Sequence, residues 1–421
     1  MTKPPKVSPA GLWDLLRPGE TVFVGGSAGE PRPVLDAWLS GNAPDKAVTF
    51  ITSCVPGINR PPLERLGPST RVVGLFPVFN SETGRTIQGA DILPLSYFGF
   101  ARAIRAGLRI DTAIIMVAPP DRDGNCSLGP LVEFLPTIIG RGARIFAVIN
   151  PRLPPIIGAP TIALQSCAAY CEVDAPLIEL RPEVGDELSS LIAGRVADLV
   201  PDGATLQTGI GKLPAQVLAR LTGRRGLGLH SGVITEDALP LFASGAVASG
   251  TIATCCALLG TASFYDWLRH TRQIRICGAE ITHDPAYLAQ VDSLIAINSA
   301  IEVDLLGQVN LERAGGRLLS AVGGAPDFAE AASRSSTGRS IIAMASATAR
   351  GRTKIVPPFA SGVPVGIARQ FVDFVVTEHG TADLRGKTQS QRAEALCAIA
   401  LPEARNSLFT AWESWSRGEA A

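Results

Sequence analysis

The chain has 421 residues and equal numbers of basic and acidic side chains, so its formal net charge at pH 7 is zero. This length favours two domains of roughly 200 residues each. The balanced charge, without any run of lysine or arginine, argues against nucleic acid or an anionic membrane as a partner. No window approaches the roughly 18 uninterrupted apolar residues of a membrane-spanning helix, and residues 1–10 lack the apolar core of a secretory leader. We therefore expect a cytoplasmic protein with no membrane segment.

The first half of the chain alternates apolar strands with helical segments. A strand at 20–26 runs into the glycine turn GGSAGEP, and a helix that begins at Pro31 carries Leu35 and Trp38 on one face. Further apolar runs, with Gly or Pro after them, lie at 47–52, 72–75, 111–117 and 145–149. This rhythm predicts a largely parallel sheet that is covered by helices on both sides.

The second half repeats the rhythm after a linker at 175–182. A helix is expected at 186–199, and a new strand begins at Ala204. Strands are expected near 228–230, 274–276, 294–298, 340–344 and 374–377, with amphipathic helices from Gln389 onward. The sequence therefore predicts two related α/β domains, at 1–182 and 183–421.

The cysteines carry no sign of a metal or disulfide framework. There are eight, and their neighbours are apolar or small. Cys167 and Cys171 have three residues between them, and no second pair follows at the spacing of a zinc site. Because disulfides are rare in the cytoplasm, we expect buried free thiols and no metal.

The stretch 204–247 contains a glycine turn that favours ligand binding. Gly209 and Gly211 let the backbone approach a ligand, and the helix after them presents unpaired N–H groups to a phosphate or an oxyanion. No third glycine follows, because Leu213-Pro214 stands in its place, so a dinucleotide fold fits poorly. With four histidines and no GxSxG elbow, no Ser-His-Asp triad is recognisable either.

Three clusters follow apolar runs and combine small residues with a carboxylate or amide. They lie at 298–304, 322–328 and 376–387. Such loops at strand ends line the crevice of open α/β sheets. In the other interpretation, Asp304, Asp327 and Glu378 only cap turns and helices.

With these clusters in view, the sequence resembles the acetyl-CoA hydrolase/transferase family, the class I CoA-transferases that include 4-hydroxybutyrate and acetate CoA-transferases. The resemblance spans nearly the whole chain, in the right order. It is carried by RPGETVFVGGSAGEP near the start, VAPPDRDGNCSLG at 117–129, VADLVPDGATLQTGIGKLP at 196–214, INSAIEVDLLGQVN at 297–310, GGAPDF at 323–328 and VVTEHGTADLRGKT at 375–388.

The resemblance implies two open α/β domains of the CoA-transferase (NagB/RpiA-like) type, with the active site in the interdomain cleft. It implies a homodimer or higher homo-oligomer that acts on coenzyme A as an acyl-CoA substrate, with no metal, and with a carboxylic acid as second substrate in a transferase. The positions that match CoA-contacting residues of the family are Gly209, Ile210, Gly211, Lys212, Leu213, Ile301 and Gly324. Asn298 lies where an amide would orient the acyl group.

The family's chemistry rests on one glutamate, which attacks the acyl-CoA and forms a glutamyl-CoA thioester. In relatives it follows the pattern G-I-H-T-E-M, and here the corresponding residues are GLHSGV, so Gly232 occupies the glutamate position. The nearest carboxylate is Glu236. If a helix begins at Ile234, Glu236 lies on its first turn and can activate a water as general base, or it only pairs with the helix dipole.

Three hypotheses follow from this departure. In the first, the protein hydrolyses an acyl-CoA, or cleaves it in a lyase-type reaction, without a glutamyl-CoA intermediate. In the second, it is a CoA-transferase in which another carboxylate, Glu236, replaces the missing one. In the third, it binds acyl-CoA without catalysis. The assigned catalytic candidates are Glu236 and Asn298.

Overall fold

The computed structural model describes residues 4–40 and 45–419, which divide into two compact units. Unit 1 consists of Met1–Arg181, Gly232–Glu236 and Ile252–Thr282, and unit 2 of the rest. The domains expected at 1–182 and 183–421 are contiguous, whereas unit 1 also includes the two later segments. The chain therefore returns to unit 1 directly after Ser231, at the residue where the family carries its glutamate.

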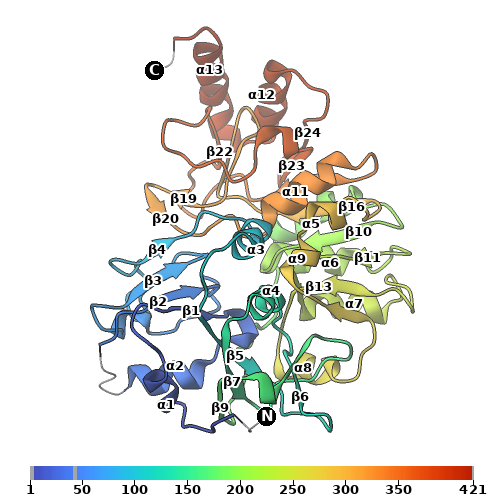
Figure 1. Cartoon of the computed structure of the whole chain (residues 1–421). Coiled ribbons are helices and arrows are strands. Elements are labelled where there is room, and N and C mark those ends of the chain that lie inside the picture. The colour runs from blue at the N-terminus through green and yellow to red at the C-terminus, as the bar shows by residue number, and fades with distance from the viewer. Residues whose placement is uncertain (1–3, 41–44, 420–421) are drawn as a thin grey trace. The chain divides into compact units, whose positions relative to one another are not determined.

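Unit 1 is built on a seven-stranded sheet in which every neighbouring pair is parallel. Figure 1 shows its first strands side by side. The order is β4-β3-β2-β1-β5-β7-β9, with bounds β1 Thr21–Val24, β2 Thr49–Thr52, β3 Arg71–Gly74, β4 Asp91–Ile92, β5 Thr112–Val117, β7 Arg144–Ile149 and β9 Ala169–Glu172. All six residues of β5 are buried, as expected for a strand covered on both faces.

Helices and short strand pairs surround this sheet. The helices are α1 Gly11–Asp14, α2 Arg32–Leu39, α3 Tyr97–Arg105, α4 Leu135–Gly140, α8 Ala262–Leu268 and α9 Ala279–Thr282. The pairs are β6 Asn125–Ser127 with β8 Thr161–Ala163, β12 Val233–Thr235 with β14 Ala257–Leu259, and β13 Ala253–Cys255 with β15 Ile274–Ile276.

Two aromatic clusters occupy the faces of the sheet. Successive residues of a strand point to opposite faces, so Phe23 faces away from Val22 and Val24. The two valines belong to the core that includes Trp13, Trp38 and Phe50, and the other face carries the cluster Phe23, Phe100 and Phe134.

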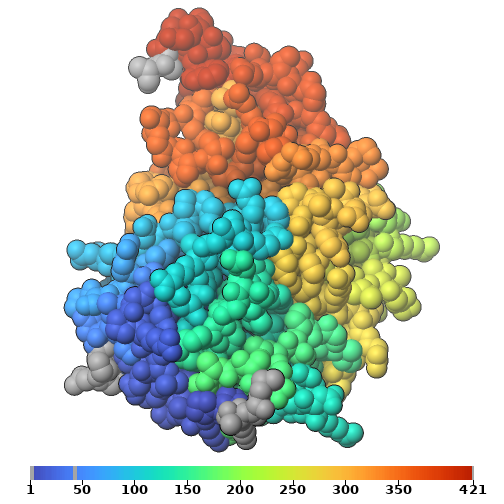
Figure 2. Space-filling view, in the orientation of Figure 1, coloured from blue at the N-terminus to red at the C-terminus, as the bar shows by residue number. Residues whose placement is uncertain are grey.

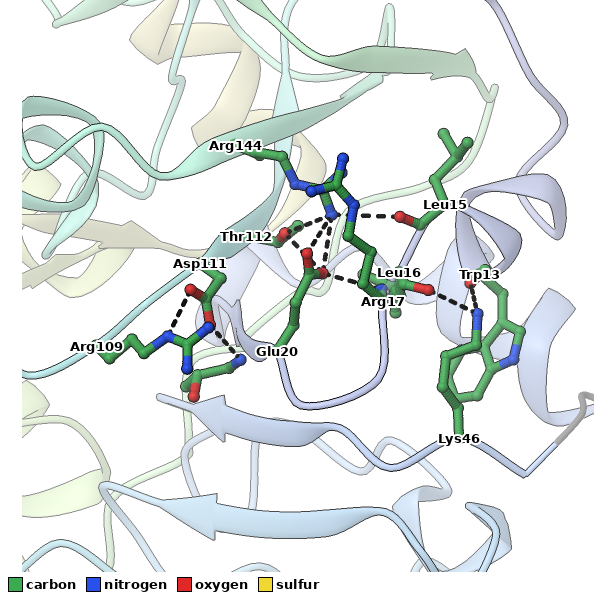
Figure 3. A network of polar contacts seen from close by, with 11 residues as sticks. Trp13, Leu15, Leu16, Arg17, Glu20, Lys46, Arg109, Asp111, Thr112 and Arg144 are labelled. Carbon is green, nitrogen blue, oxygen red and sulfur yellow. Dashed lines mark hydrogen bonds and ion pairs between the residues drawn. The ribbon is translucent and has the colours of Figure 1, made fainter.

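Ion pairs join the amino ends of the central strands of unit 1 (Figure 3). Arg144, at the start of β7, donates to both carboxylate oxygens of Glu20 at 2.8 Å and to Thr112 Oγ1 at 3.1 Å. Asp111 accepts from the N–H of Thr21 at 2.8 Å. Since these charges pair where β1, β5 and β7 begin, they hold the strand starts together and leave the carboxyl ends to other side chains.

Unit 2 contains a six-stranded sheet of order β11-β10-β16-β21-β23-β24. Its strands are β10 Thr205–Thr208, β11 Gly228–Leu229, β16 Leu294–Asn298, β21 Arg339–Ala343, β23 Phe374–Thr377 and β24 Gly380–Asp383. Only the β23–β24 pair in it is antiparallel. The expected α/β class with largely parallel sheets is confirmed.

The remaining elements of unit 2 cover that sheet or extend it. Its helices are α5 Glu187–Asp198, α6 Lys212–Arg220, α7 Leu239–Ala243, α10 Pro285–Leu288, α11 Ala325–Arg334, α12 Gln389–Ala398 and α13 Arg405–Ser416. Small sheets consist of β17 Glu302–Asp304, β18 Val309–Asn310 and β22 Ile355–Val356, and of β19 Arg313–Ala314 and β20 Arg317–Leu318. In Figure 2 the side chains of α13 (dark red) form one end of unit 2.

The predicted helices begin where their capping residues stand. Asp186 caps α5 and Thr388 caps α12, each within a reciprocal capping box. The segment after Gly232 does not form the helix from Ile234 on which Glu236 was expected to lie. Residues 233–235 are strand β12, because the β-branched sequence Val-Ile-Thr pairs with β14. Glu236 instead begins a short 3-10 turn, η4 Glu236–Ala238.

Candidate active site

The carboxyl edge of the unit 2 sheet has a topological switch point between β10 and β16. These two parallel strands are neighbours, yet β10 continues to β11 on one side and β16 to β21 on the other. Their loops therefore leave in opposite directions and open a crevice, which is where open α/β sheets bind ligands. The glycine turn follows β10, and Asn298 ends β16.

The glycine turn after β10 contains one position, Gly211, whose backbone conformation favours glycine. Gly211 has φ +102° and ψ −175° and is the N-cap of the nine-residue helix α6. A Cβ at Gly209 or Gly211 would have no neighbour within 4 Å. The first N–H groups of α6 are thus approached through open space. Lys212, the first residue of the helix, pairs with Asp186 at 3.1 Å.

Asn298 is held by a reciprocal pair of amides. It lies buried at the end of β16, where its Nδ2 donates to Gln207 Oε1 at 3.1 Å, and Gln207 Nε2 donates to Asn298 Oδ1 at 3.3 Å. Ser231 Oγ donates to the carbonyl of Thr208 at 2.9 Å. These bonds fix the ends of β10 and β16 against each other.

A pocket of about 310 Å³ lies in unit 2 beside two of the sequence-predicted positions. Ile301 lines it, together with Val322 and Ala325, which flank Gly324. A Cβ at Gly324 would overlap the ring of His283. Burial and the nearby His230 lower the pKa of His283 to about 3, so the ring is neutral. Gly324 is therefore required for space, since its φ of −91° suits any residue.

Two of the conspicuous carboxylates of unit 2 hold loops in place. Asp304 accepts from the N–H groups of Leu306 and Gln308 at 3.0 and 2.8 Å. Glu378 accepts from the N–H and Oγ of Ser346 at 2.9 and 2.6 Å. The contacts of Asp304 are those of a turn cap, whereas Glu378 binds a serine 32 residues away and ties two loops together.

Unit 1 has a corresponding switch point between β1 and β5, and the turn 25–29 follows β1 there. Asn59 holds this turn, because its Oδ1 accepts from Ser27 N–H at 2.8 Å and its Nδ2 donates to Glu30 Oε2 at 2.6 Å. Ser27 has φ +46°, an unusual value for a residue with a side chain. Burial raises the pKa of Glu30, against the effect of its ion pair with Arg32.

Sequence reasoning missed the most perturbed carboxyl group of this edge, Glu133. It is 1% exposed and has φ +35°. Ser53 Oγ donates to its Oε2 at 2.7 Å and Tyr97 OH to its Oε1 at 3.0 Å, and Ser53 Oγ accepts from Gly26 N–H at 3.0 Å. Burial raises the pKa of Glu133 to about 7, although both hydroxyl donors favour the charged form.

A signal for Glu133 was present in the sequence. It is the only charged residue of the run LVEFL, which follows Pro130. A carboxylate inside such an apolar run is rarely buried without a partner, but its partners come from residues 53 and 97 and are brought to it only by the fold.

Gly232 is linked to the backbone of Glu133 through Cys256 within unit 1. The N–H groups of Cys256 and Ala257 both donate to the carbonyl of Gly232, at 3.1 and 3.0 Å. On its other side, the carbonyl of Cys256 accepts from the N–H of Glu133 at 3.1 Å. The Cys256 thiol also donates to the carbonyl of Gly232 at 3.1 Å, and its pKa is raised by burial and by the charge of Glu133.

Glu236 lies at the other end of β12. Its Oε2 accepts from the N–H of Thr261 at 2.9 Å, immediately before α8. Glu236 thus bonds to the residue before α8 and not to a helix of its own beginning at Ile234, and the catalytic roles assigned to Glu236 and Asn298 stay predictions.

All eight cysteines are free and buried, as expected. Burial raises the pKa of each thiol, for example to about 12 at Cys167, which makes a thiolate unfavourable. Within residues 4–40 and 45–419, no group of three or more His, Cys, Asp or Glu side chains could hold a metal ion. Over the same ranges, no helix is long and apolar enough to cross a membrane.

Comparison with known proteins gives one consistent answer. Residues 260–412 match the acetyl-CoA hydrolase/transferase C-terminal domain. The chain is 33% identical to a succinyl-CoA:acetate/propanoyl-CoA:succinate CoA transferase of Fasciola hepatica, covering 93% of this chain and 84% of that protein. It is 34% identical to a 4-hydroxybutyrate coenzyme A transferase of Clostridium kluyveri, over 72% of each chain. The crystal structure of RipA from Yersinia pestis superposes with a TM-score of 0.89, at 26% identity over 98% of each chain. The chain belongs to the acetyl-CoA hydrolase/transferase family.

Proposed function

We propose that the protein cleaves an acyl-CoA thioester, by hydrolysis or in a lyase-type reaction, without a glutamyl-CoA intermediate at position 232. The observation that carries this proposal is Gly232, which stands where the family pattern has its glutamate. A glycine has no nucleophile, so no acyl–glutamyl anhydride can form there. With no covalent enzyme intermediate, water is the simplest acceptor of the acyl group.

Features for binding CoA support the same proposal. The residues proposed to contact CoA are 209–213, Ile301 and Gly324. The open glycine turn and the pocket beside Ile301 suit a pyrophosphate and a flexible thiol arm. Asn298 is proposed to orient the acyl group. By analogy with the family we also propose a cytoplasmic homodimer or higher homo-oligomer.

The transferase alternative depends on Glu236. Its carboxylate accepts the N–H of Thr261, and a nucleophile displaced from the family position by several residues would lose orders of magnitude in rate. The third alternative, binding without catalysis, has no observation in its favour beyond the missing glutamate.

Release of free CoA from a panel of acyl-CoAs, measured with a thiol reagent, tests the proposal. We expect release without any carboxylic acid present, no increase when acetate or succinate is added, and no adduct after hydroxylamine or borohydride trapping. An adduct on any glutamate, or release only with a carboxylic acid, would establish transfer instead. Binding without release would establish the third alternative.

The variant Gly232→Glu tests the proposal from the opposite direction, because it restores the glutamate of the family pattern. If the CoA-binding loops are intact, the restored carboxylate should form a trappable glutamyl adduct and give acceptor-dependent transfer. If the variant binds acyl-CoA as tightly as the wild type but forms no adduct, the loss of the family mechanism extends beyond residue 232.

A further inference from the structure

The carboxyl group of Glu133 is the best-placed acid in unit 1 that the proposed reaction has not yet used. It is buried, and two hydroxyl groups from different elements donate to it, Ser53 after β2 and Tyr97 at the start of α3. Ser53 also accepts the N–H of Gly26, in the turn after β1. One chain of hydrogen bonds therefore joins this carboxyl group to the glycine turn at the switch point of unit 1.

Its position relative to Gly232 follows from the local strand pairing. Residues 130–133 lie along one side of the segment 256–258, and Gly232 with β12 lies along the other. Neighbouring paired strands are about 4.8 Å apart, so the backbones at 133 and 232 are about 10 Å apart. Cys256 links the two backbones. Its thiol donates to the Gly232 carbonyl, and the charge of Glu133 contributes to its raised pKa.

This offset favours one kind of chemistry. A carboxylate displaced by that distance from the family position cannot attack the same thioester carbon in the same way, because covalent catalysis requires the reacting atoms about 3 Å apart. A general base reaches its target through one water molecule, so a carboxylate at this offset suits that role and not that of a nucleophile.

The backbone at this place is also strained. Three non-glycine residues in the described part of the chain have positive φ, namely Ser27, Glu133 and Ser293. Two of the three belong to this hydrogen-bonded region. Strained backbone persists where the surrounding contacts over-determine it, and it concentrates at functional sites.

We propose that Glu133 is the general base of thioester hydrolysis in this protein, a step that rests on the proposed function. Its carboxylate takes a proton from a water molecule as the water oxygen bonds to the thioester carbon. The C–S bond then breaks, and the protonated Glu133 returns the proton to the departing CoA thiolate. The balance is acyl-CoA plus water to carboxylic acid plus CoA, and the carboxylate is regenerated.

The protonation behaviour of the site supports this role. The pKa of Glu133, raised by burial to about 7, lets the group gain and lose a proton near neutral pH. The titratable groups that face it or lie on the elements packed around it are Tyr97, Cys54, Cys256 and Glu280, and also Glu30, which pairs with Arg32. Burial raises the pKa of Tyr97, Cys54 and Cys256 well above their ordinary values. It also raises the pKa of Glu30, against the effect of Arg32, and Glu280 accepts from Thr137 at 3.1 Å. Glu133 is the group of this cluster whose pKa is raised to about 7.

The test compares three variants with the wild type in CoA release without an acceptor, from pH 5 to 9. Glu133→Gln keeps the shape but cannot take a proton, and we expect kcat to fall at least about 100-fold with little change in KM. Glu82→Gln is the matched control, an exposed carboxyl group of unit 1 that pairs with Arg65 at 2.9 Å, and it should keep wild-type activity and pH profile. In the wild type, kcat should fall toward low pH as Glu133 becomes protonated; this fall is the acid limb of the pH profile. The residual activity of Glu133→Gln should not show it.

Tyr97→Phe provides a second test, in which the pH dependence of kcat is measured while the Glu133 carboxyl group is retained. Without the tyrosine donor the charged form of Glu133 is less stable, so its pKa rises and the acid limb of kcat should move to higher pH. A merely structural role for Glu133 would not move that limb. Thermal unfolding of each variant separates loss of folding from loss of chemistry.

Two results would overturn the proposal in distinguishable ways. If the wild type releases CoA without an acceptor but Glu133→Gln retains its kcat and acid limb, the assignment of the base is wrong and the proposed function stands. Loss of activity in Glu236→Gln would then transfer the role to that residue. If the wild type releases no CoA without an acceptor, the proposed function fails and the role of Glu133 in hydrolysis fails with it.

Discussion

The carboxyl edges of the two sheets have the same topology but different side chains. In unit 1 the turn at the switch point between β1 and β5 carries or is bonded to ionisable groups, namely the buried Glu30 and Glu133 and the half-buried Tyr97. In unit 2 the switch point between β10 and β16 has open glycines and a pair of neutral amides. Proton transfer requires groups whose protonation changes, whereas binding of a polar ligand requires accessible N–H groups and space. The edge of unit 1 therefore has the groups that proton transfer needs, and the edge of unit 2 has those that ligand binding needs.

The opposite edge of unit 1 sharpens this contrast. There Glu20, although also buried, is bonded by Arg144 through both carboxylate oxygens. The partners of the Glu133 carboxyl group are instead two neutral hydroxyl groups. The guanidinium ties Glu20 to the strand starts, whereas burial among neutral donors raises the pKa of Glu133 to about 7.

The largest expected effect that tests this contrast is on stability. Glu133 has a pKa of about 7 in the folded protein and 4.5 as its ordinary value. Between these values the unfolded chain is ionised while the folded protein keeps its proton, so ionisation opposes folding as pH rises. Relative to Glu133→Gln, which does not titrate, the wild type should lose about 3 kcal/mol of unfolding free energy between pH 4 and pH 8. Denaturant unfolding at several pH values measures this, and parallel curves would show that the carboxyl group is not perturbed.

A second prediction concerns the binding edge of unit 2. Gly211→Ala places a side chain at φ +102° and ψ −175°, a conformation that costs a non-glycine residue about 1–3 kcal/mol. We expect KM for acyl-CoA to rise roughly 5- to 100-fold with little change in kcat, if the turn binds the nucleotide end of CoA. Gly223→Ala is the control, because a Cβ there also meets open space and its φ is not positive. A change in kcat alone would place chemistry, and not binding, at this edge.

The smallest expected effect is at Gly324. The variant Gly324→Ala has an acceptable backbone conformation but a Cβ that overlaps the buried His283 ring. Overpacking of this kind costs about 1 kcal/mol or more, and the shifted ring should raise KM several-fold. The double variant with His283→Ala should recover part of both losses. Equal stability of Gly324→Ala and the wild type in denaturant unfolding would show that the ring moves away without cost.

The sequence by itself was sufficient for the features that depend on local patterns. Apolar runs such as 111–117 predicted buried parallel strands, helices were expected at 186–199 and from Gln389 onward, and the long motifs identified the family. The missing glutamate at Gly232 is also visible without a structure. These features are encoded in adjacent residues, so no tertiary contact is needed to recognise them.

Only the tertiary structure decided where the remaining carboxyl groups stand. Glu236 was chosen because it is near Gly232 in sequence, but β12 carries it to the start of α8. Glu133 is about a hundred residues away in sequence, yet strand pairing through Cys256 brings its backbone to about 10 Å from that of Gly232. Its raised pKa results from burial and from donors at residues 53 and 97. A perturbed carboxyl group is a property of its surroundings, and those surroundings exist only once the chain has folded.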